Sequence, residues 1–211
     1  MIFDLLFQNT PLFFAIVFAF VVSISVHEFA HALTATQLGD PTAKNMGRLT
    51  LNPLSHIDPM GMLLVLFIGF GWGRPVPFNP LNLRNQQWGP AFISLAGPIT
   101  NIAMMLLAGI ALRIFGPSLG AENMLVYFLV FMVQLNLILA IFNLIPLPPL
   151  DGSKVLFGFL PSRFSHIQMT LERTGPLALF GLILVDRLLL GGVIFGGLFT
   201  WAFGLIEGLF L

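Results

Sequence analysis

The sequence contains no cysteine and few charged residues. Without cysteine, the chain has neither disulfide bonds nor thiolate ligands for a metal. Asp, Glu, Lys and Arg make up only 9% of the residues, whereas a soluble domain has roughly 25%. The net charge is zero and the basic residues form no cluster, which argues against nucleic acid as a partner.

Hydrophobic residues take the place of the missing charges. They make up 57% of the chain, and the mean hydropathy is +0.94. Apolar segments cover about 11–38, 60–71, 91–115, 123–146, 175–190 and 192–211. A helix needs about 20 residues to cross a bilayer, so the second segment is short enough to be re-entrant or interfacial. We therefore predict an all-α integral membrane protein with about five transmembrane helices.

The most informative motif is HEFAH, from His27 to His31, inside the first apolar segment. Residues four apart share a helix face, so His27 and His31 are able to bind one zinc ion. Glu28 would then act as the general base for a water activated by the metal. Ionisable side chains are costly inside a membrane and usually have a function there. The alternative is that they only form hydrogen bonds between helices.

A catalytic zinc ion usually takes three protein ligands, so a third side chain is expected elsewhere. Asp151 is the best candidate, because it follows the apolar segment 123–146 in a proline-rich turn that Gly152 closes. If 91–115 and 123–146 cross the membrane and 60–71 does not, Asp151 returns to the depth of His31. A solvated turn carboxylate is the other interpretation of Asp151.

The basic residues support the same topology. With 60–71 not crossing, most of them lie on one side of the membrane, as the positive-inside rule expects of the cytoplasmic face: Lys44, Arg48, Arg74, Arg84, Lys154, Arg163 and Arg173. We therefore predict a multi-pass protein of the cell membrane with its N-terminus outside. The active site is expected toward the cytoplasmic side.

Together these motifs resemble the site-2 protease family of intramembrane zinc metalloproteases. HEFAH is similar to the HExxH helix of that family, and NLIPLPPLDG, residues 143–152, is similar to its second signature. NPLSHIDPMG at 52–61 and AGPITN at 96–101 resemble the compact bacterial and archaeal branch without PDZ or CBS domains.

The resemblance implies one Zn²⁺ per chain, bound by His27, His31 and Asp151, with Glu28 as the catalytic base. It also implies hydrolysis of peptide bonds in or near transmembrane segments of protein or peptide substrates within the lipid bilayer. We expect residues 1–211 to form a single membrane-embedded peptidase domain. Its catalytic core would cover about 11–160, and a C-terminal helical hairpin about 174–211.

Three further residues are candidates for contacts with the substrate or the oxyanion: Asn143, Asn101 and His56. For Asn143, hydrogen bonding between helices is the alternative role, and for His56 a plain surface role. A helical substrate must unwind before cleavage, so segments 48–52 and 74–79 are predicted as a small β-hairpin or edge-strand element that pairs with it.

Two other classes of protein remain compatible with the sequence. A membrane metal-ion transporter also places His and carboxylates in its helices, but it needs ligands spread along a path through the bilayer. An inactive relative would keep the scaffold and bind membrane proteins without cutting them. The sequence leaves the oligomeric state open.

Overall fold

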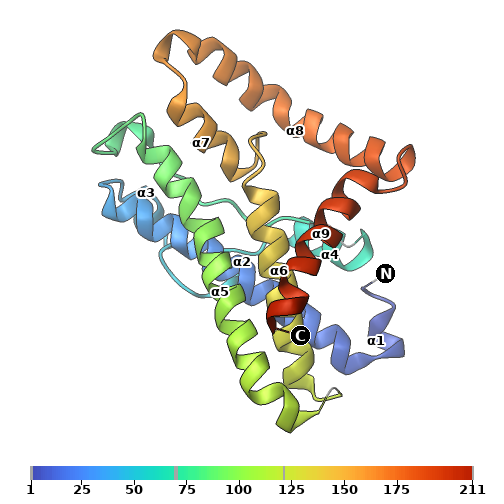
Figure 1. The fold of residues 1–211 in the computed structure, drawn as a ribbon. Helices are drawn as coiled ribbons and strands as arrows, with labels where there is room; N and C mark the ends of the chain where they lie inside the picture. Colours follow the sequence, from blue (N-terminus) through green and yellow to red (C-terminus); the bar gives the residue numbers. More distant parts are fainter. Residues whose placement is uncertain (1, 69–70, 121, 211) are drawn as a thin grey trace.

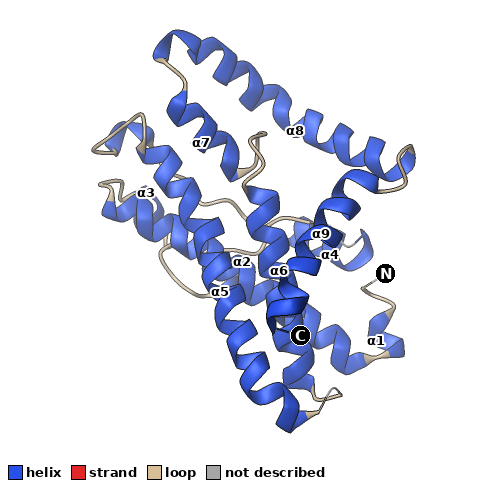
Figure 2. Ribbon diagram, in the orientation of Figure 1, coloured by secondary structure: helices blue, strands red, loops and turns tan. Residues whose placement is uncertain are grey.

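The computed structural model describes residues 2–68, 71–120 and 122–210, and these residues form helices joined by loops (Figures 1 and 2). In chain order the α-helices are α1 (Leu5–Gln8), α2 (Thr10–Gln37), α3 (Thr42–Asn45), α4 (Pro59–Ile68), α5 (Gly89–Leu119), α6 (Met124–Asn143), α7 (Asp151–Phe159), α8 (Ser165–Leu188) and α9 (Val193–Phe210). The described residues therefore confirm the predicted helical class.

The ends of α2 follow from local sequence. Asn9 caps the helix, because its side-chain oxygen accepts a hydrogen bond from the Leu12 N–H. Pro11 lies in the first turn, where its missing N–H costs nothing. The helix ends before Gly39, whose φ of 108° suits only glycine. These residues mark the start and the end of a 28-residue helix that contains the HEFAH motif.

Among the described residues, three helices are long and apolar enough to cross a membrane: α2, α5 and α6, with 28, 31 and 20 residues. A fourth span is possible only if α8 and α9 count as one, and these two helices meet at an angle of 86°. The structure thus supports three or four spans rather than the predicted five or so. The predicted C-terminal hairpin is instead a corner.

Asp186 explains this corner. Its buried carboxylate accepts hydrogen bonds from the backbone N–H groups of Ile194 and Phe195 and so caps the start of α9. Gly191 and Gly192 both have positive φ and turn the chain between the two helices. An apolar sequence can show two segments here, but it does not reveal that a carboxylate fixes the angle between them.

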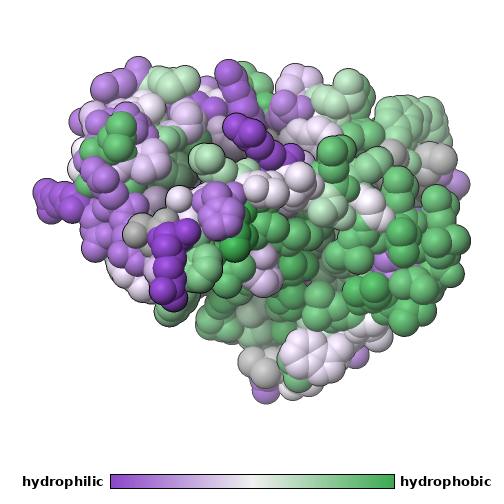
Figure 3. All heavy atoms as spheres, turned by 90° about the horizontal axis from the view of Figure 1, so that it is seen from above, coloured by the Kyte–Doolittle hydropathy of each residue, from purple (hydrophilic) through white to green (hydrophobic). Residues whose placement is uncertain are grey.

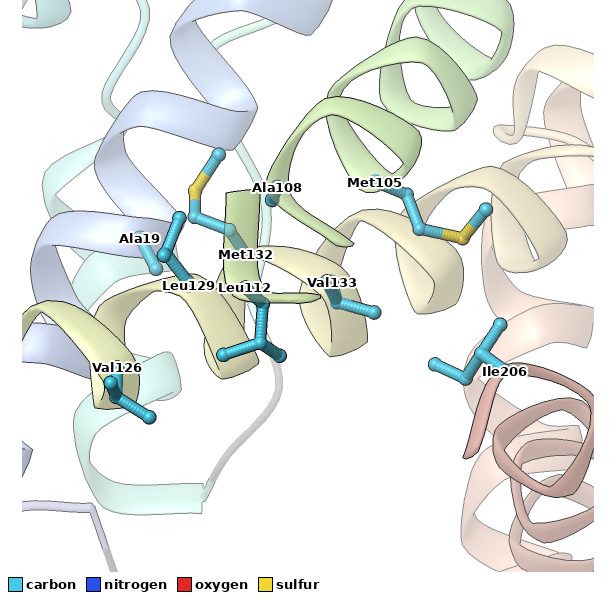
Figure 4. Packing of buried hydrophobic residues seen from close by; sticks show 9 residues of the cluster. All are labelled: Ala19, Met105, Ala108, Leu112, Val126, Leu129, Met132, Val133 and Ile206. Atoms are coloured by element: carbon cyan, nitrogen blue, oxygen red, sulfur yellow. The ribbon is translucent and has the colours of Figure 1, made fainter. Parts of the chain in front are cut away.

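The core lies between α2, α5 and α6, with α9 packed beside them (Figure 4). The buried cluster contains Ala19, Met105, Ala108, Leu112, Val126, Leu129, Met132, Val133 and Ile206. Large apolar side chains on the outer faces of α2 and α5 are exposed, among them Phe14, Phe18 and Leu107. An exposed apolar surface of this kind suits helices surrounded by lipid.

The segment predicted not to cross the membrane forms α4, which has only 10 residues and is about 15 Å long. This length is half of what a span needs. The predicted β element is not found in the described residues. Segments 48–52 and 74–79 contain no strand, and the neighbouring residues Ile57 and Gly73 form an isolated bridge.

The extended segment Gly73–Asn79, which we call the strap, owes its shape to side chains rather than to a partner strand. Pro75 and Pro77 have no N–H to offer a sheet. The guanidinium of Arg48 donates to the carbonyls of Arg74 and Pro75. Because side chains satisfy these groups, no β-ladder is needed to hold the segment.

α6 returns the chain to the end of the bundle where α2 finishes, and α7 starts there (Figure 1). Seen from above, hydrophilic residues gather on the side where α3 and the start of α5 lie, and hydrophobic residues dominate the opposite side (Figure 3). Beyond α7 the chain continues into α8, which an ion pair between Lys154 and Glu172 ties to α7. The fold therefore brings the HEFAH helix and Asp151 to one end.

Candidate metal centre

His27 and His31 lie on the same face of α2, one turn apart and almost fully buried. Their Nε2 atoms are 3.0 Å apart. The rings are nearly perpendicular, with an angle of 88° between their planes. Both nitrogens therefore point at one location beside the helix.

Asp151 reaches the same location from the start of α7. Its Oδ2 atom lies 3.3 Å from Nε2 of His27 and 3.3 Å from Nε2 of His31. Gly152 allows this approach, because a Cβ atom there would collide with the carbonyl of Leu144. The sequence-predicted ligand set thus forms one cluster in the described part of the chain.

The carboxylate of Asp151 is prepared to bind a cation. The Oδ2 atom is buried and accepts no hydrogen bond from any described residue. A buried ionised oxygen without a hydrogen bond is costly unless a cation meets it.

The second nitrogen of each ring fixes which atom faces the cluster. Nδ1 of His31 lies 2.7 Å from the backbone carbonyl of Ile93, which only accepts, so this nitrogen carries the hydrogen. Nδ1 of His27 lies 2.6 Å from Oδ1 of Asn101. With Nδ1 protonated, each neutral ring offers the Nε2 lone pair to the cluster.

These observations fit zinc. Two imidazole lone pairs and a carboxylate oxygen crowd within 3.3 Å of one another and repel each other unless a cation lies between them. Two His and one carboxylate also form a known ligand set of catalytic zinc, which keeps a fourth position for water or substrate. The residues present therefore match the cofactor that the sequence predicted.

Glu28 is buried next to the cluster and is oriented by the strap. Its Oε2 atom accepts a hydrogen bond of 3.0 Å from the backbone N–H of Val76. The strap is itself fixed on both sides, because Arg74 N–H donates to the carbonyl of His56 and Asn79 N–H donates to Asp40. The carboxylate of Glu28 is therefore held in place by a backbone segment far from it in sequence.

The three further candidates lie in different places. Asn101 is behind His27, on the side away from the cluster, where it accepts from Nδ1. Asn143 donates to the carbonyl of Leu139 in its own helix, at the end of α6. His56 is fully buried in the loop before α4 and donates from Nε2 to the carbonyl of Thr50. Neither Asn143 nor His56 belongs to the described cluster, and a substrate role for all three stays a prediction.

Two residues outside the predicted ligand set also shape the centre. Val76 was not a candidate, because its backbone N–H and not its side chain contacts Glu28. Asn136 of α6 donates nothing to the cluster but accepts a hydrogen bond from Asn101. The sequence indicates this role for Asn136, because a polar residue in an apolar span is suited to hydrogen bonding between helices.

Comparison with known proteins is consistent with this geometry. Residues 112–184 match the model of Peptidase family M50. Over 152 residues the chain is 40% identical to a Bacillus subtilis protein named "Putative zinc metalloprotease YwhC", covering 69% of each chain. It is 32% identical over 206 residues to "Putative zinc metalloprotease Rip2" of Mycolicibacterium smegmatis, covering 94% of this chain and 73% of that protein. No solved structure matches the chain at a significant level.

Proposed function

Because this chain belongs to peptidase family M50, the site-2 protease family, and is a zinc metalloprotease, we propose that it cuts peptide bonds in or near transmembrane segments of other proteins. In this proposal His27, His31 and Asp151 bind the zinc ion and Glu28 is the catalytic base. The observation that carries the proposal is the convergence of these three ligands at one end of an apolar helix bundle.

The reaction follows from the positions of the chain's own groups. A bound zinc ion would lower the pKa of a water molecule and polarise the scissile carbonyl. Glu28 would take the proton of that water and later deliver it to the leaving amine. The hydrogen bond from Val76 limits the carboxylate to orientations that keep one oxygen toward the strap. The other oxygen then remains available for the proton.

The substrate class follows from the surroundings of the centre. The chain is a multi-pass membrane protein, and His27 and His31 lie inside one of its candidate spans. A peptide bond must therefore come to the bundle, and the proteins present there are membrane proteins in lipid. Since helical amides are hidden in hydrogen bonds, we propose that the substrate binds unwound. We propose that the centre lies toward the cytoplasmic side of the cell membrane, because the positive-inside rule places the basic residues around it on that side.

The rival functions are less well supported. A transporter needs ligands along a path, whereas the described metal-binding residues gather at one depth. An inactive relative would have no need for a glutamate held beside the ligands. We propose that residues 1–211 act as one peptidase domain, in which the turn after α6 supplies the third ligand.

The proposal is tested with the purified full chain in liposomes that contain a library of single-span proteins tagged at both ends. Glu28→Gln should abolish cleavage, at least about 100-fold, and keep one zinc per chain. Asp151→Asn should lose both zinc and cleavage. Glu122→Gln, an exposed residue of the α5–α6 turn, is the matched control and should keep both. Full cleavage by Glu28→Gln, or unchanged zinc in Asp151→Asn, would refute the proposal.

A further inference from the structure

A chain of hydrogen bonds runs from His27 into the core between three helices. Asn101 of α5 accepts from His27 at 2.6 Å and donates from Nδ2 to Oδ1 of Asn136 at 2.7 Å. Asn136 of α6 donates from Nδ2 to the Met132 carbonyl at 2.8 Å and to the Ser23 hydroxyl of α2 at 2.9 Å. Asn101, Asn136 and Ser23 have no exposed surface.

The direction of this chain is set at its far end. The carbonyl of Met132 only accepts, so the atom of Asn136 that faces it must be the NH₂ group. Oδ1 of Asn136 is then turned toward Asn101, which must present its own NH₂ group there. This leaves Oδ1 of Asn101 facing His27, so the hydrogen of the ring must be on Nδ1. Each step follows from the previous one without a free choice.

We propose that Asn101 and Asn136 are positioning residues that fix the tautomer and ring plane of His27, so that its Nε2 lone pair faces the metal. This inference rests on the proposed role of His27 as a zinc ligand. Asn136 does not touch the centre and acts through Asn101. Met132 belongs to the packed cluster of Figure 4, which gives the chain of hydrogen bonds a rigid origin.

The burial of His27 makes this control of its tautomer effective. A histidine in water changes tautomer easily, because solvent satisfies either nitrogen. No described polar group other than Asn101 contacts Nδ1 of His27, and the burial of the ring excludes solvent. If Asn101 flipped its amide, its NH₂ group would face the ring and its oxygen would face the oxygen of Asn136. The ring could meet the NH₂ group only by moving its hydrogen to Nε2, and the hydrogen bond between Asn101 and Asn136 would be lost in either case. Asn136 therefore opposes the flip.

The proposal predicts a different outcome for each position. Asn136→Leu removes the acceptor that orients Asn101, so the amide of Asn101 is free to flip. Ser23→Ala is the matched control, because it removes a hydrogen bond from the same Asn136 but leaves the Met132 carbonyl. Asn136→Asp is the rescue variant. Its carboxyl group still accepts from Asn101 and, when protonated, donates to Met132.

The decisive measurement is nitrogen NMR of the metal-free full chain in detergent, with its histidines labelled. The His27 signal is assigned by its loss in His27→Gln. In the wild type, His27 should carry a hydrogen on Nδ1. In Asn136→Leu, a population protonated only on Nε2 should appear, and zinc affinity measured by chelator competition should fall by about 10- to 100-fold. Ser23→Ala and Asn136→Asp should stay within about threefold of the wild type.

Several results would overturn the proposal. A wild-type ring without hydrogen on Nδ1 refutes it directly and needs no variant. Weaker zinc binding by Asn136→Leu with an unchanged tautomer would show a role in packing only. An unchanged zinc affinity in Asn136→Leu, with folding confirmed by circular dichroism, would also refute it. If His27→Gln binds zinc as well as the wild type, the proposed metal site fails. The tautomer of His27 in the metal-free wild type still tests the chain of hydrogen bonds by itself.

Discussion

Gly97 of α5 lies directly against His31 of α2, and a Cβ atom at Gly97 would be only 2.6 Å from the Nε2 atom of His31. The same Cβ atom would also press on the ring of His27. Even a methyl group at this position therefore has no room, because both rings are held by hydrogen bonds to α5 itself. The close approach of α5 to α2 depends on this glycine.

Gly97→Ala is expected to disturb the metal centre more than the fold. Overpacking of this kind typically costs about 1–3 kcal/mol, and the displaced rings should lower zinc affinity by at least about tenfold. Zinc content after dialysis against a chelator measures the effect. Gly116→Ala in the same helix is the control, because its Cβ would meet Leu112 at an ordinary 3.4 Å. Equal zinc retention in the two variants would contradict the prediction.

Much of the centre was predictable because its parts are local patterns. His27 and His31 are one helical turn apart, and the proline-rich turn before Asp151 marks the end of a span. Counting the membrane crossings between them was enough to predict that Asp151 lies near His27 and His31, as it does in the structure. Zinc also followed from the ligand types.

The rest depends on contacts that a sequence does not encode locally. The strap was predicted as an edge strand because its prolines suit the edge of a sheet, but the Arg48 side chain takes the carbonyls that a strand would use. The last apolar segments were predicted as a hairpin, but Asp186 caps α9 and sets a corner. Asn101 was a candidate for contacts with the substrate or the oxyanion, which stays a prediction, and the sequence did not show that its oxygen accepts from the ring of His27. In each case one side chain meets a distant backbone or ring.

Arg48→Met is expected to slow cleavage while zinc content stays unchanged. The buried guanidinium of Arg48 holds the carbonyls of Arg74 and Pro75, and the next residue of the strap, Val76, orients Glu28. A loosened strap should lower kcat about tenfold, which is less than the full rate enhancement that a general base contributes. Cleavage of a tagged single-span substrate and zinc analysis measure the two quantities.

The matched control for the strap is Arg84→Met, because Arg84 is an exposed arginine of a neighbouring loop. It should leave the rate within about twofold of the wild type, as is usual for a surface substitution. An unchanged rate in Arg48→Met would show that the strap does not position Glu28. Loss of zinc in Arg48→Met would show instead that the strap supports the ligands.

Asp40→Asn is expected to destabilise the protein in a pH-dependent manner. Asp40 is buried after α2 and accepts hydrogen bonds from Thr42, Asn79 and Asn82. Burial would raise the pKa of Asp40, but these hydrogen bonds outweigh it and hold that pKa below its usual range. The ionised carboxylate therefore stabilises the folded state.

The dependence on pH has a definite direction. Because the pKa of Asp40 is lower in the folded than in the unfolded chain, its stabilising effect is complete above the unfolded value of about 3.9. It is lost as the pH falls through the folded value. The thermal midpoint of Asp40→Asn in detergent should thus lie below that of the wild type at neutral pH. This gap between the two midpoints should narrow as the pH falls. A gap that stays constant down to the acid limit of folding would mean that hydrogen-bond geometry, and not the charge of Asp40, holds the end of the strap.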